Sequence, residues 1–433
     1  MKKFLTIMLV LCLSASLAGC FPQSNSSFAQ SGTRSSSVPG ASSSPEESGS
    51  SKTEQPETPG ESGGSLKHVS QMMGRYGTDE GFYFYKNTHF TANAGDDYEN
   101  LMYIDYKTKK QVYLCGKADC SHGDESCTSY MNGRGAQGLF TWNGKLYRLS
   151  NASSRDGTTI VPGLFESDLD GRNKRMLYAL ESGIEWLRDF VFGGGVLYAD
   201  VSVMTVEKDA ETGAEFGTAS DLNSRLLKID LTNGSAEIVL DLTDKTIAGT
   251  HETKIILSER KGGRLTFFAY DTTDASTKEI ASIGDTYAYT VGDGFVYYAL
   301  PEDKKIYAID LSGGETSTLP QNAEFVPEIM AFHAGTIICI PPYGEGIYNY
   351  FINPSTGETG QVGLYLSGIE DQSPIEIMAE WGDYFLVTSG YKMAREFVDW
   401  VGVWQDYIES EIFSLIKKED YLSGNANYLP IEE

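Results

Sequence analysis

The sequence contains few histidines, few cysteines and fewer basic than acidic residues. There are 5 His and 6 Cys, and 34 Lys and Arg stand against 60 Asp and Glu, for a formal net charge of −26. This balance argues against nucleic acid or an anionic lipid surface as a partner, because such partners are bound by basic patches. Beyond the N-terminal segment, no apolar run approaches the length needed to span a membrane.

Motifs of common catalytic sites are also missing. Outside the Ser-rich segment near the N-terminus there is no G-x-S-x-G, and the chain has no H-E-x-x-H, no P-loop and no G-x-G-x-x-G after a strand. The histidines are scattered, and we interpret each as structural or surface-exposed rather than as a general base: His68, His89, His122, His251 and His333. The many acidic residues single out no carboxylate pair for a hydrolase, so no catalytic residue is assigned and an enzyme is not expected.

The N-terminus has the order of features found in a lipoprotein signal peptide. Lys2 and Lys3 precede an apolar run, residues 4–13, that is too short to span a bilayer, and the sequence Leu-Ala-Gly-Cys follows at 17–20. This tetrapeptide resembles the lipobox of bacterial lipoproteins. The resemblance implies that residues 1–19 are removed and that Cys20 receives acyl chains such as palmitate. It further implies a lipid anchor on the extracellular face of the cell membrane; an ordinary cleaved signal or an uncleaved anchor is the alternative.

Residues 20–66 are dominated by Ser, Gly, Pro, Glu and Thr. Such a composition buries too little apolar surface to offset the entropy of ordering, so we expect a disordered tether. Flexible-coil scaling gives this tether a reach of roughly 35–40 Å. The segment resembles the tethers of Gram-positive lipoproteins.

Residues 67–433 are predicted to form an all-β repeat domain. One repeated unit is a short strand, a tight turn and an apolar strand. Its copies are FTWNGKLYRLS (140–150), FVFGGGVLYADV (190–201), YTVGDGFVYYAL (289–300), MAFHAGTIICIP (330–341) and MAEWGDYFLVTS (378–389), with looser copies at 77–87 and 257–270. Pairs such as Asn143-Gly144 favour hairpin turns that need positive φ.

A second unit follows, in which a strand ends in an Asx residue before a turn and another strand. The Asx residues are Asp105, Asp168, Asp230, Asp310 and Asn353. Two hairpins per unit predict four-stranded blades that bury both faces by stacking in a ring, and we count seven units. The pattern resembles a β-propeller, similar to TolB-like and quinoprotein-like propellers. Six or eight blades, or two β-sandwich domains, are the alternatives.

The segment CGKADCSHGDESC places Cys115, Cys120, His122 and Cys127 close together. Three thiolates and an imidazole suit a structural zinc ion with no open coordination position. The rival interpretation is a disulfide, which is common in secreted chains, and a third is neither. Cys339 lies in an apolar strand and is interpreted as a buried hydrophobic residue. The segment resembles one in propeller-like lipoproteins of gut Firmicutes, a group of unassigned function.

An aromatic segment near the C-terminus is a candidate binding surface. Trp400, Trp404 and Tyr407, with Trp381 upstream, have a spacing that fits one face of a short helix. The aromatic side chains could form a platform that stacks on a sugar or a peptide; alternatively, the helix simply packs on the last blade. The loop 202–224 is the largest internal insertion expected.

Together these features predict a membrane-anchored surface lipoprotein whose propeller binds or scaffolds a protein, peptide or glycan. One alternative is a glycan-acting hydrolase or lyase on the same fold. Another is a structural accessory subunit of an envelope complex.

Overall fold

The computed structural model describes residues 65–69, 74–87, 98–132, 136–151, 161–208, 215–342, 348–369, 372–398 and 403–433. All of them belong to the unit Thr58–Glu433. The signal peptide, Cys20, nearly all of the tether and Trp400 lie outside the described residues. The sequence interpretations of those parts therefore stay predictions.

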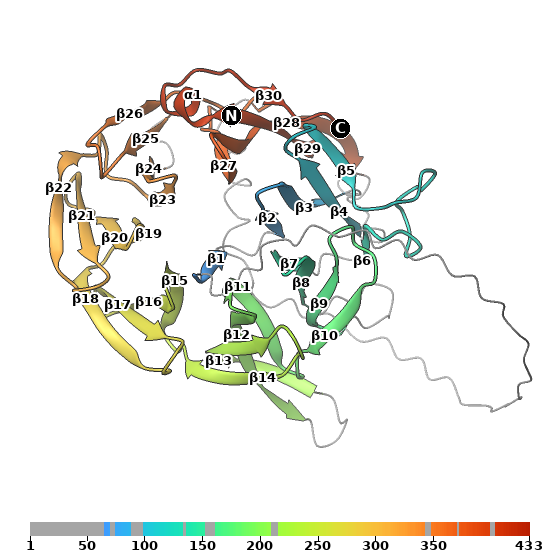
Figure 1. Ribbon diagram of the computed structural model, residues 1–433, viewed down its shortest axis with the longest axis horizontal. Helices are drawn as coiled ribbons and strands as arrows, with labels where there is room; N and C mark the ends of the chain where they lie inside the picture. The colour runs from blue at the N-terminus through green and yellow to red at the C-terminus, as the bar shows by residue number, and fades with distance from the viewer. Residues whose placement is uncertain are drawn as a thin grey trace, which may run out of the picture. The chain divides into compact units, whose positions relative to one another are not determined.

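The described strands form seven antiparallel sheets that follow one another around a ring (Figure 1). In each sheet, four strands succeed one another in chain order from the centre of the ring to its rim. This is a seven-bladed β-propeller, which confirms the predicted fold class and blade count. Six blades, eight blades and two β-sandwich domains are excluded.

The first four blades have the following bounds. Blade 1 contains β2 (Arg75–Gly77), β3 (Gly81–Asn87), β4 (Tyr98–Asp105), β5 (Lys110–Tyr113) and β6 (Tyr130–Asn132). Blade 2 contains β7 (Ala136–Trp142), β8 (Lys145–Ser150), β9 (Gly163–Asp168) and β10 (Arg175–Ala179). Blade 3 contains β11 (Ile184–Gly193), β12 (Val196–Lys208), β13 (Glu215–Asp230) and β14 (Ala236–Asp241), and β1 (Lys67–Val69) adds to it as a fifth strand. Blade 4 contains β15 (Lys245–His251), β16 (Lys254–Lys261), β17 (Arg264–Asp271) and β18 (Thr277–Gly284).

The remaining three blades complete the ring. Blade 5 contains β19 (Tyr289–Gly292), β20 (Phe295–Ala299), β21 (Lys305–Asp310) and β22 (Thr316–Asn322). Blade 6 contains β23 (Ile329–His333), β24 (Thr336–Ile340), β25 (Asn349–Ile352) and β26 (Thr359–Val362). Blade 7 contains β27 (Glu376–Trp381), β28 (Tyr384–Val398), β29 (Val403–Lys417) and β30 (Leu429–Pro430), with the short helix α1 (Lys418–Leu422) before its last strand.

The two repeated units are the first and the third of the three strand connections in a blade. The first joins the inner two strands through turns with positive φ, as at Asn143 (φ 48) and Gly144 (φ 69). The prediction of a looser copy at 257–270 was wrong by one strand. This segment spans β16 and β17, the second and third strands of blade 4, and not the first and second. There the inner hairpin turns instead at Glu252, whose φ is 53.

The second unit joins the third and fourth strands. The Asx side chain accepts a hydrogen bond from a backbone N–H two residues later at Asp105, Asp230, Asp310 and Asn353, and also at Asp271, which the sequence analysis missed. Asp168 differs, because its carboxylate accepts from Lys145 Nζ at 2.6 Å and from Asn173 Nδ2 at 2.5 Å. Four of the five Asx residues named from the sequence thus bond the backbone of the turn that follows them.

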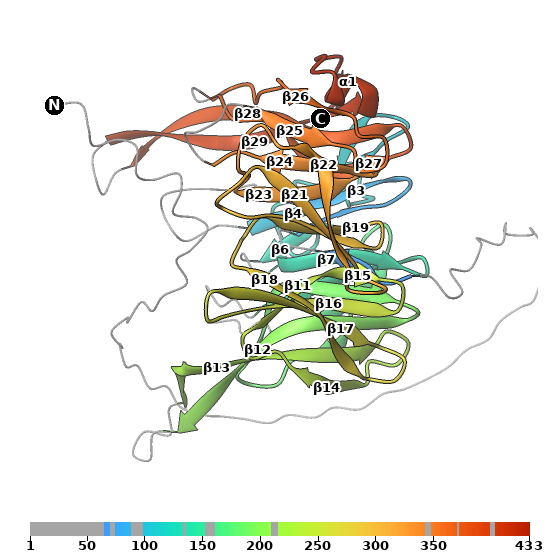
Figure 2. The same ribbon diagram turned by 90° about the vertical axis from the view of Figure 1, so that its left-hand side faces the viewer.

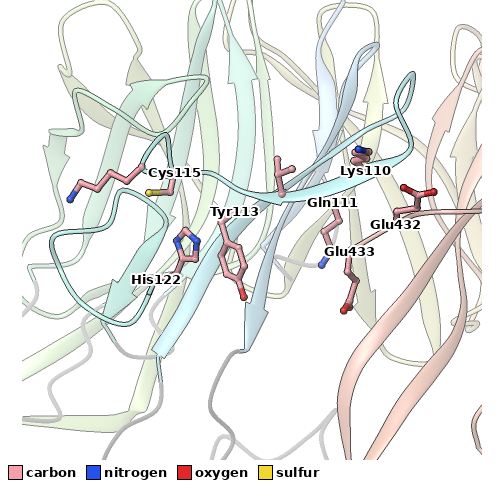
Figure 3. Close-up of a pocket in the computed structure, with 9 residues that line it drawn as sticks. Lys110, Gln111, Tyr113, Cys115, His122, Glu432 and Glu433 are labelled. Carbon is pink, nitrogen blue, oxygen red and sulfur yellow. The ribbon is translucent and has the colours of Figure 1, made fainter. Parts of the chain in front are cut away.

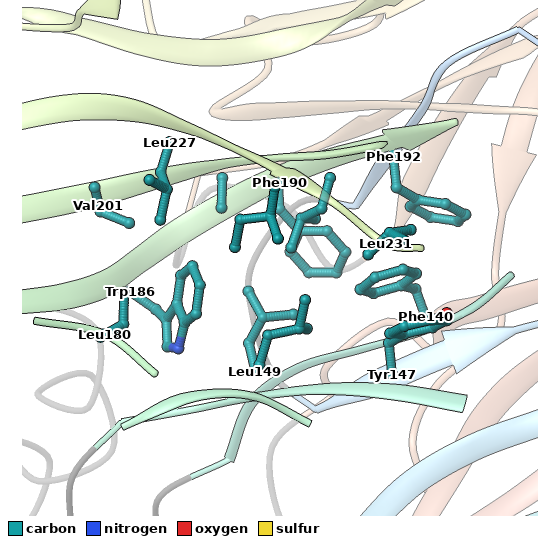
Figure 4. Close-up of a cluster of buried hydrophobic side chains, with 14 residues drawn as sticks. Phe140, Tyr147, Leu149, Leu180, Trp186, Phe190, Phe192, Val201, Leu227 and Leu231 are labelled. Atoms are coloured by element: carbon teal, nitrogen blue, oxygen red, sulfur yellow. The ribbon is translucent and has the colours of Figure 1, made fainter. Parts of the chain in front are cut away.

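The hydrophobic core lies between neighbouring blades. The cluster between blades 2 and 3 stacks Phe140 on Tyr147 and packs Phe140 against Phe192, with ring centroids 4.6 Å apart for the latter pair (Figure 4). Similar clusters fill the other interfaces, including the one that closes the ring between blades 7 and 1. Each blade therefore depends on both neighbours for burial of its faces.

The first and the last described residues are tied to different parts of the ring. At the C-terminus, Gln111 of β5 donates its N–H to the Glu432 carbonyl (2.7 Å), and Glu432 donates its own to the Lys109 carbonyl (2.8 Å). The C-terminal residues thus pass from blade 7 onto the outer edge of blade 1. At the other end, β1 pairs with β11, the inner strand of blade 3, at the centre of the ring (Figure 1).

Two hairpins extend beyond their blades and project from the same side of the ring (Figure 2). They are β12–β13 and β28–β29, whose strands run for 13, 16, 15 and 15 residues. The first replaces the loop expected at 202–224, of which residues 209–214 lie outside the described part. The second replaces the expected helix, so that prediction was wrong: the segment is a β-ribbon.

Candidate functional site

The Cys/His segment interrupts the outer strand of blade 1. Both β5 and β6 pair with β4, one after the other along its edge, and residues 115–128 leave the sheet between them. Leu101 of β4 lies opposite both ends of this loop, because its carbonyl accepts from the Leu114 N–H (3.0 Å) and its N–H donates to the Ser129 carbonyl (2.8 Å). The hydroxyl of Thr128 donates to the Leu114 carbonyl at 2.7 Å. Residues 115–128 therefore form a loop whose two ends are held together by these hydrogen bonds.

Within this loop, the structure brings together all four residues singled out by the sequence. One donor atom from each of Cys115, Cys120, His122 and Cys127 lies within 4.8 Å of the others. The Nδ1 atom of His122 is 3.2 Å from the Sγ atom of Cys127. Cys127 is buried, at 4% exposure, and the other three are half-buried. The four cysteines of the described residues, Cys339 included, are all free.

Local hydrogen bonds fold the loop so that its donors face inward. Asp124 accepts from the N–H of Ser126 (2.8 Å) through its side chain and from the N–H of Cys127 (3.0 Å) through its carbonyl. The ammonium of Lys117 donates to the Ser126 carbonyl across the loop. His122 has φ 58, a left-handed conformation, and its ring stacks on Tyr113 of β5 with centroids 4.0 Å apart.

A second layer of polar contacts fixes this loop to the blade. The buried side chain of Asn100, on β4, donates from Nδ2 to the His122 carbonyl (3.0 Å) and to Ser129 Oγ (3.2 Å). The same Ser129 oxygen lies 3.0 Å from Cys127 Sγ. Because Ser129 Oγ accepts from Asn100, its own hydrogen is available for the sulfur.

Cys115 of the cluster and the isolated Cys339 differ in acidity. Burial works to raise the pKa of Cys115, but hydrogen bonds from the Lys117 backbone and from the neighbouring thiols outweigh it and lower that pKa to about 7. By contrast, burial raises the pKa of Cys339 to about 12. Cys339 is completely buried in β24, as expected for a small hydrophobic residue.

A groove of about 430 Å³ borders the cluster (Figure 3). Tyr113, Cys115 and His122 line one part of it. Glu432 and Glu433, from the C-terminus, line the other. The groove therefore connects the Cys/His loop with the residues that join blade 7 to blade 1.

The aromatic residues of blade 7 do not form one platform. Trp381 lies at the inner turn of the blade, where its ring is 5.3 Å from that of Tyr106 and 5.7 Å from that of Tyr384. Trp404 pairs with Phe397 at the opposite end of β28. Tyr407 pairs with Ala394 and so lies on the other face of the ribbon from Trp404. Trp400 lies outside the described residues.

The β28–β29 ribbon instead presents an apolar face that the sequence analysis missed. The pairs Phe397–Trp404 and Met393–Ile408 lie on one face, and their exposed fractions are 43%, 60%, 40% and 44% in that order. Between them, Arg395 forms an ion pair with Asp406 at 3.4 Å. Because the charged residues Arg395 and Asp406 lie on the same face between the apolar pairs, the sequence lacks the simple apolar–polar alternation that would have revealed this face.

Histidine 68 and two acidic residues meet at the inner strands of blade 3. His68 of β1 lies 3.5 Å from the carboxylate of Asp189 on β11. Asp200 of β12 is buried, and this burial raises its pKa to about 6, although Ser224 donates a hydrogen bond to it. These residues do not line the groove beside the Cys/His loop.

Within the described ranges, no helix has the length and apolar character required to cross a membrane.

Several solved structures have a similar fold. Puromycin hydrolase is 13% identical, with a TM-score of 0.49, covering 79% of this chain and 54% of its own. Oligogalacturonate lyase from Vibrio parahaemolyticus is 13% identical, with a TM-score of 0.42, covering 82% and 98%. TolB from Acinetobacter baumannii is 12% identical, with a TM-score of 0.36, covering 85% and 80%. No family model and no curated protein matches the sequence. Likenesses at this level carry no information about activity.

Proposed function

We propose that this protein is a lipid-anchored propeller on the cell surface that binds a protein partner through the apolar face of the β28–β29 ribbon. The observation that carries the proposal is the exposure of Phe397, Trp404, Met393 and Ile408 together on one projecting face. Large exposed apolar groups that gather on one face are typical of interaction sites, and aromatic residues supply much of the binding energy at such sites.

The backbone of the ribbon supports the same proposal. In the described residues, β27 pairs with β28 only as far as Thr388, and β30 pairs with β29 only at Ser414 and Leu415. The outer part of the ribbon is thus two-stranded, and two-stranded hairpins are marginally stable alone in water. An added strand or a covering surface would stabilise it. Aliphatic Met393 and Ile408 favour a protein or peptide over a glycan, because sugars stack on aromatic rings.

The lipid anchor is proposed from Cys20 and the preceding lipobox. The position of β1 suits a tether, because residues 65–69 lie at the centre of the ring and are bonded to its inner strands. Leu66 donates its N–H to the Glu252 carbonyl (3.1 Å) and accepts from the Thr250 hydroxyl (3.0 Å). A pull on the tether would act on blade 4 through these bonds and on blade 3 through the pairing of β1 with β11.

An enzyme is less well supported. A glycan-acting hydrolase or lyase would need carboxyl groups of raised pKa that converge on a cavity. Burial raises the pKa of Asp200 and Glu376, yet neither lines the described groove.

Photo-crosslinking in the producing bacterium tests the binding proposal. A photoreactive phenylalanine replaces Trp404 in the full chain, and in a matched control it replaces Ile329, which is 52% exposed on blade 6. We expect a discrete adduct with another membrane or surface protein from position 404 and none from position 329. Absence of an adduct at 404, or an adduct only with a second copy of this chain, would refute a distinct protein partner.

The anchor is tested separately by metabolic labelling with an alkyne analogue of palmitate. The full chain should be labelled and recovered in membranes, and the Cys20→Ser variant should lose the label. Equal labelling of both would rule out acylation at Cys20.

A further inference from the structure

We propose that Cys115, Cys120, His122 and Cys127 bind one zinc ion in a closed tetrahedral site. Three thiolates and one imidazole form a set of ligands that is typical of structural zinc. On binding, the thiols would release their protons to solvent and coordinate as thiolates. The proposal does not depend on the ribbon or on the lipid anchor.

The positions of the donor atoms fit this ion. Zinc–sulfur bonds of about 2.3 Å and a zinc–nitrogen bond of about 2.0 Å place the tetrahedral ligand atoms of this set roughly 3.5–3.8 Å apart. The four donor atoms already lie within 4.8 Å of one another, and His122 Nδ1 and Cys127 Sγ are 3.2 Å apart. No pair therefore has to close by more than about 1 Å to reach tetrahedral spacing.

The convergence of all four donors favours metal over a disulfide. A disulfide would bring two sulfur atoms together and would leave a third thiol and an imidazole with no reason to face them. Here the stacking on Tyr113 and the left-handed backbone of His122 turn its Nδ1 toward Cys127. Both are features of a loop shaped around a common centre.

The surroundings of the cluster match those of metal ligands in proteins. Thiolate ligands are commonly held by hydrogen-bond donors outside the coordination sphere. Ser129 supplies such a donor to Cys127, and Asn100 holds Ser129 in turn. With four protein ligands no coordination position remains for a substrate, so the ion would stabilise the fold and would not catalyse a reaction.

The position of the loop indicates what zinc would stabilise. The loop separates β5 from β6, and the hydrogen bonds of Leu101 to Leu114 and Ser129 help to hold both strands on the edge of β4. Residues 109–111 beside this loop receive the C-terminal Glu432 from blade 7. Zinc would therefore secure the edge of blade 1 to which the C-terminus is attached, and so the closure of the ring.

The test uses the processed full chain, purified from washed membranes without chelator or reductant. Mass spectrometry of bound metals should find one equivalent of zinc. Cys127→Ser should lose it, whereas Cys339→Ser, a matched change in the cysteine outside the cluster, should keep it. After chelation of the wild-type chain, added Co²⁺ should give the intense visible bands of tetrahedral thiolate coordination.

Three results would overturn the proposal. One is a metal-free chain in which a thiol count in denaturant finds two of the four described thiols missing, the signature of a disulfide. The second is zinc retained equally by Cys127→Ser. The third is the absence of thiolate–cobalt bands in the wild-type chain, a result that holds even where a cysteine variant fails to fold.

Discussion

Ser129 Oγ lies 3.0 Å from Cys127 Sγ and receives a hydrogen bond from Asn100 Nδ2. This relation connects the loop that carries the Cys/His cluster to the third strand of blade 1, because Asn100 lies on β4. Because the Ser129 oxygen accepts from Asn100, its own hydrogen is available to the sulfur of Cys127. A residue of the blade thus holds the outer side of a proposed zinc ligand.

Ser129→Ala should weaken zinc binding by about 10- to 100-fold, as loss of an outer hydrogen bond to a ligand typically does. Competition with a chromogenic chelator measures this affinity. Ser167 is also a buried serine, but it lies on blade 2 and away from the cluster, so Ser167→Ala should leave the zinc affinity unchanged. Equal affinity in wild type and Ser129→Ala would show that the hydroxyl does not act on the ligand.

Asp200 should make the free energy of unfolding depend on pH. Burial raises its pKa in the folded protein to about 6, against about 3.9 when unfolded. Its neutral form favours the folded state fully below pH 4, and this contribution is lost as pH rises through 6. The loss amounts to about 3 kcal/mol. The stability of Asp200→Asn relative to wild type should therefore increase by that order between pH 4 and pH 7.

Denaturant unfolding at several pH values measures this difference. Asp244→Asn is the control, because Asp244 is exposed and its left-handed φ of 64 suits asparagine. If the relative stability of Asp200→Asn stays the same at pH 4 and pH 7, the buried carboxyl is not the titrating group.

Phe413→Ala should destabilise the ring by about 3–5 kcal/mol, because it leaves a cavity between blades 7 and 1. The Phe413 ring lies 6.0 Å from that of Phe82 and 5.1 Å from that of Phe84, measured between centroids. Phe397→Ala, the same substitution on the exposed ribbon, should change the free energy of unfolding by no more than about 0.5 kcal/mol. Similar effects of both variants in chemical denaturation would contradict closure of the ring through this interface.

The double variant Phe397→Ser, Trp404→Ser should release the partner while leaving the propeller intact. Extraction of membranes in mild detergent and native electrophoresis should show the wild-type chain in a larger complex and the variant as the free chain. Ile329→Ser tests whether any exposed apolar group has this effect, and it should behave as wild type. A complex of unchanged size in the double variant would exclude this face as the contact.

The propeller could be predicted from the sequence because its signals are local. An Asx residue bonds a backbone group two residues away, as Asp230 does with Thr232, and the inner hairpins turn at short pairs such as Asn143-Gly144. These patterns recur in most blades, so the blade count could be predicted from the sequence. The Cys/His cluster was predictable for the same reason, since its four residues lie within one short segment.

Features that depend on distant pairing were not predictable. Asn100 bonds Ser129 through pairing of β4 with β6, and β1 joins blade 3 although blades 1 and 2 lie between them in the chain. The ribbon was mistaken for a helix because apolar and charged residues alternate within one of its faces. Met393, Arg395 and Phe397 share that face, which hides the two-residue period of a strand.

The central claim, that a partner covers the projecting ribbon, is tested most directly by hydroxyl-radical footprinting. Oxidation of Trp404 and Met393 is compared between membranes of the producing cells and the purified full chain reconstituted in liposomes. Tyr287, which is 74% exposed and lies just before the first strand of blade 5, serves as the internal control. The account predicts several-fold slower oxidation of Trp404 and Met393 in the cell membranes, with Tyr287 unchanged. Equal oxidation of the ribbon in both preparations would contradict it.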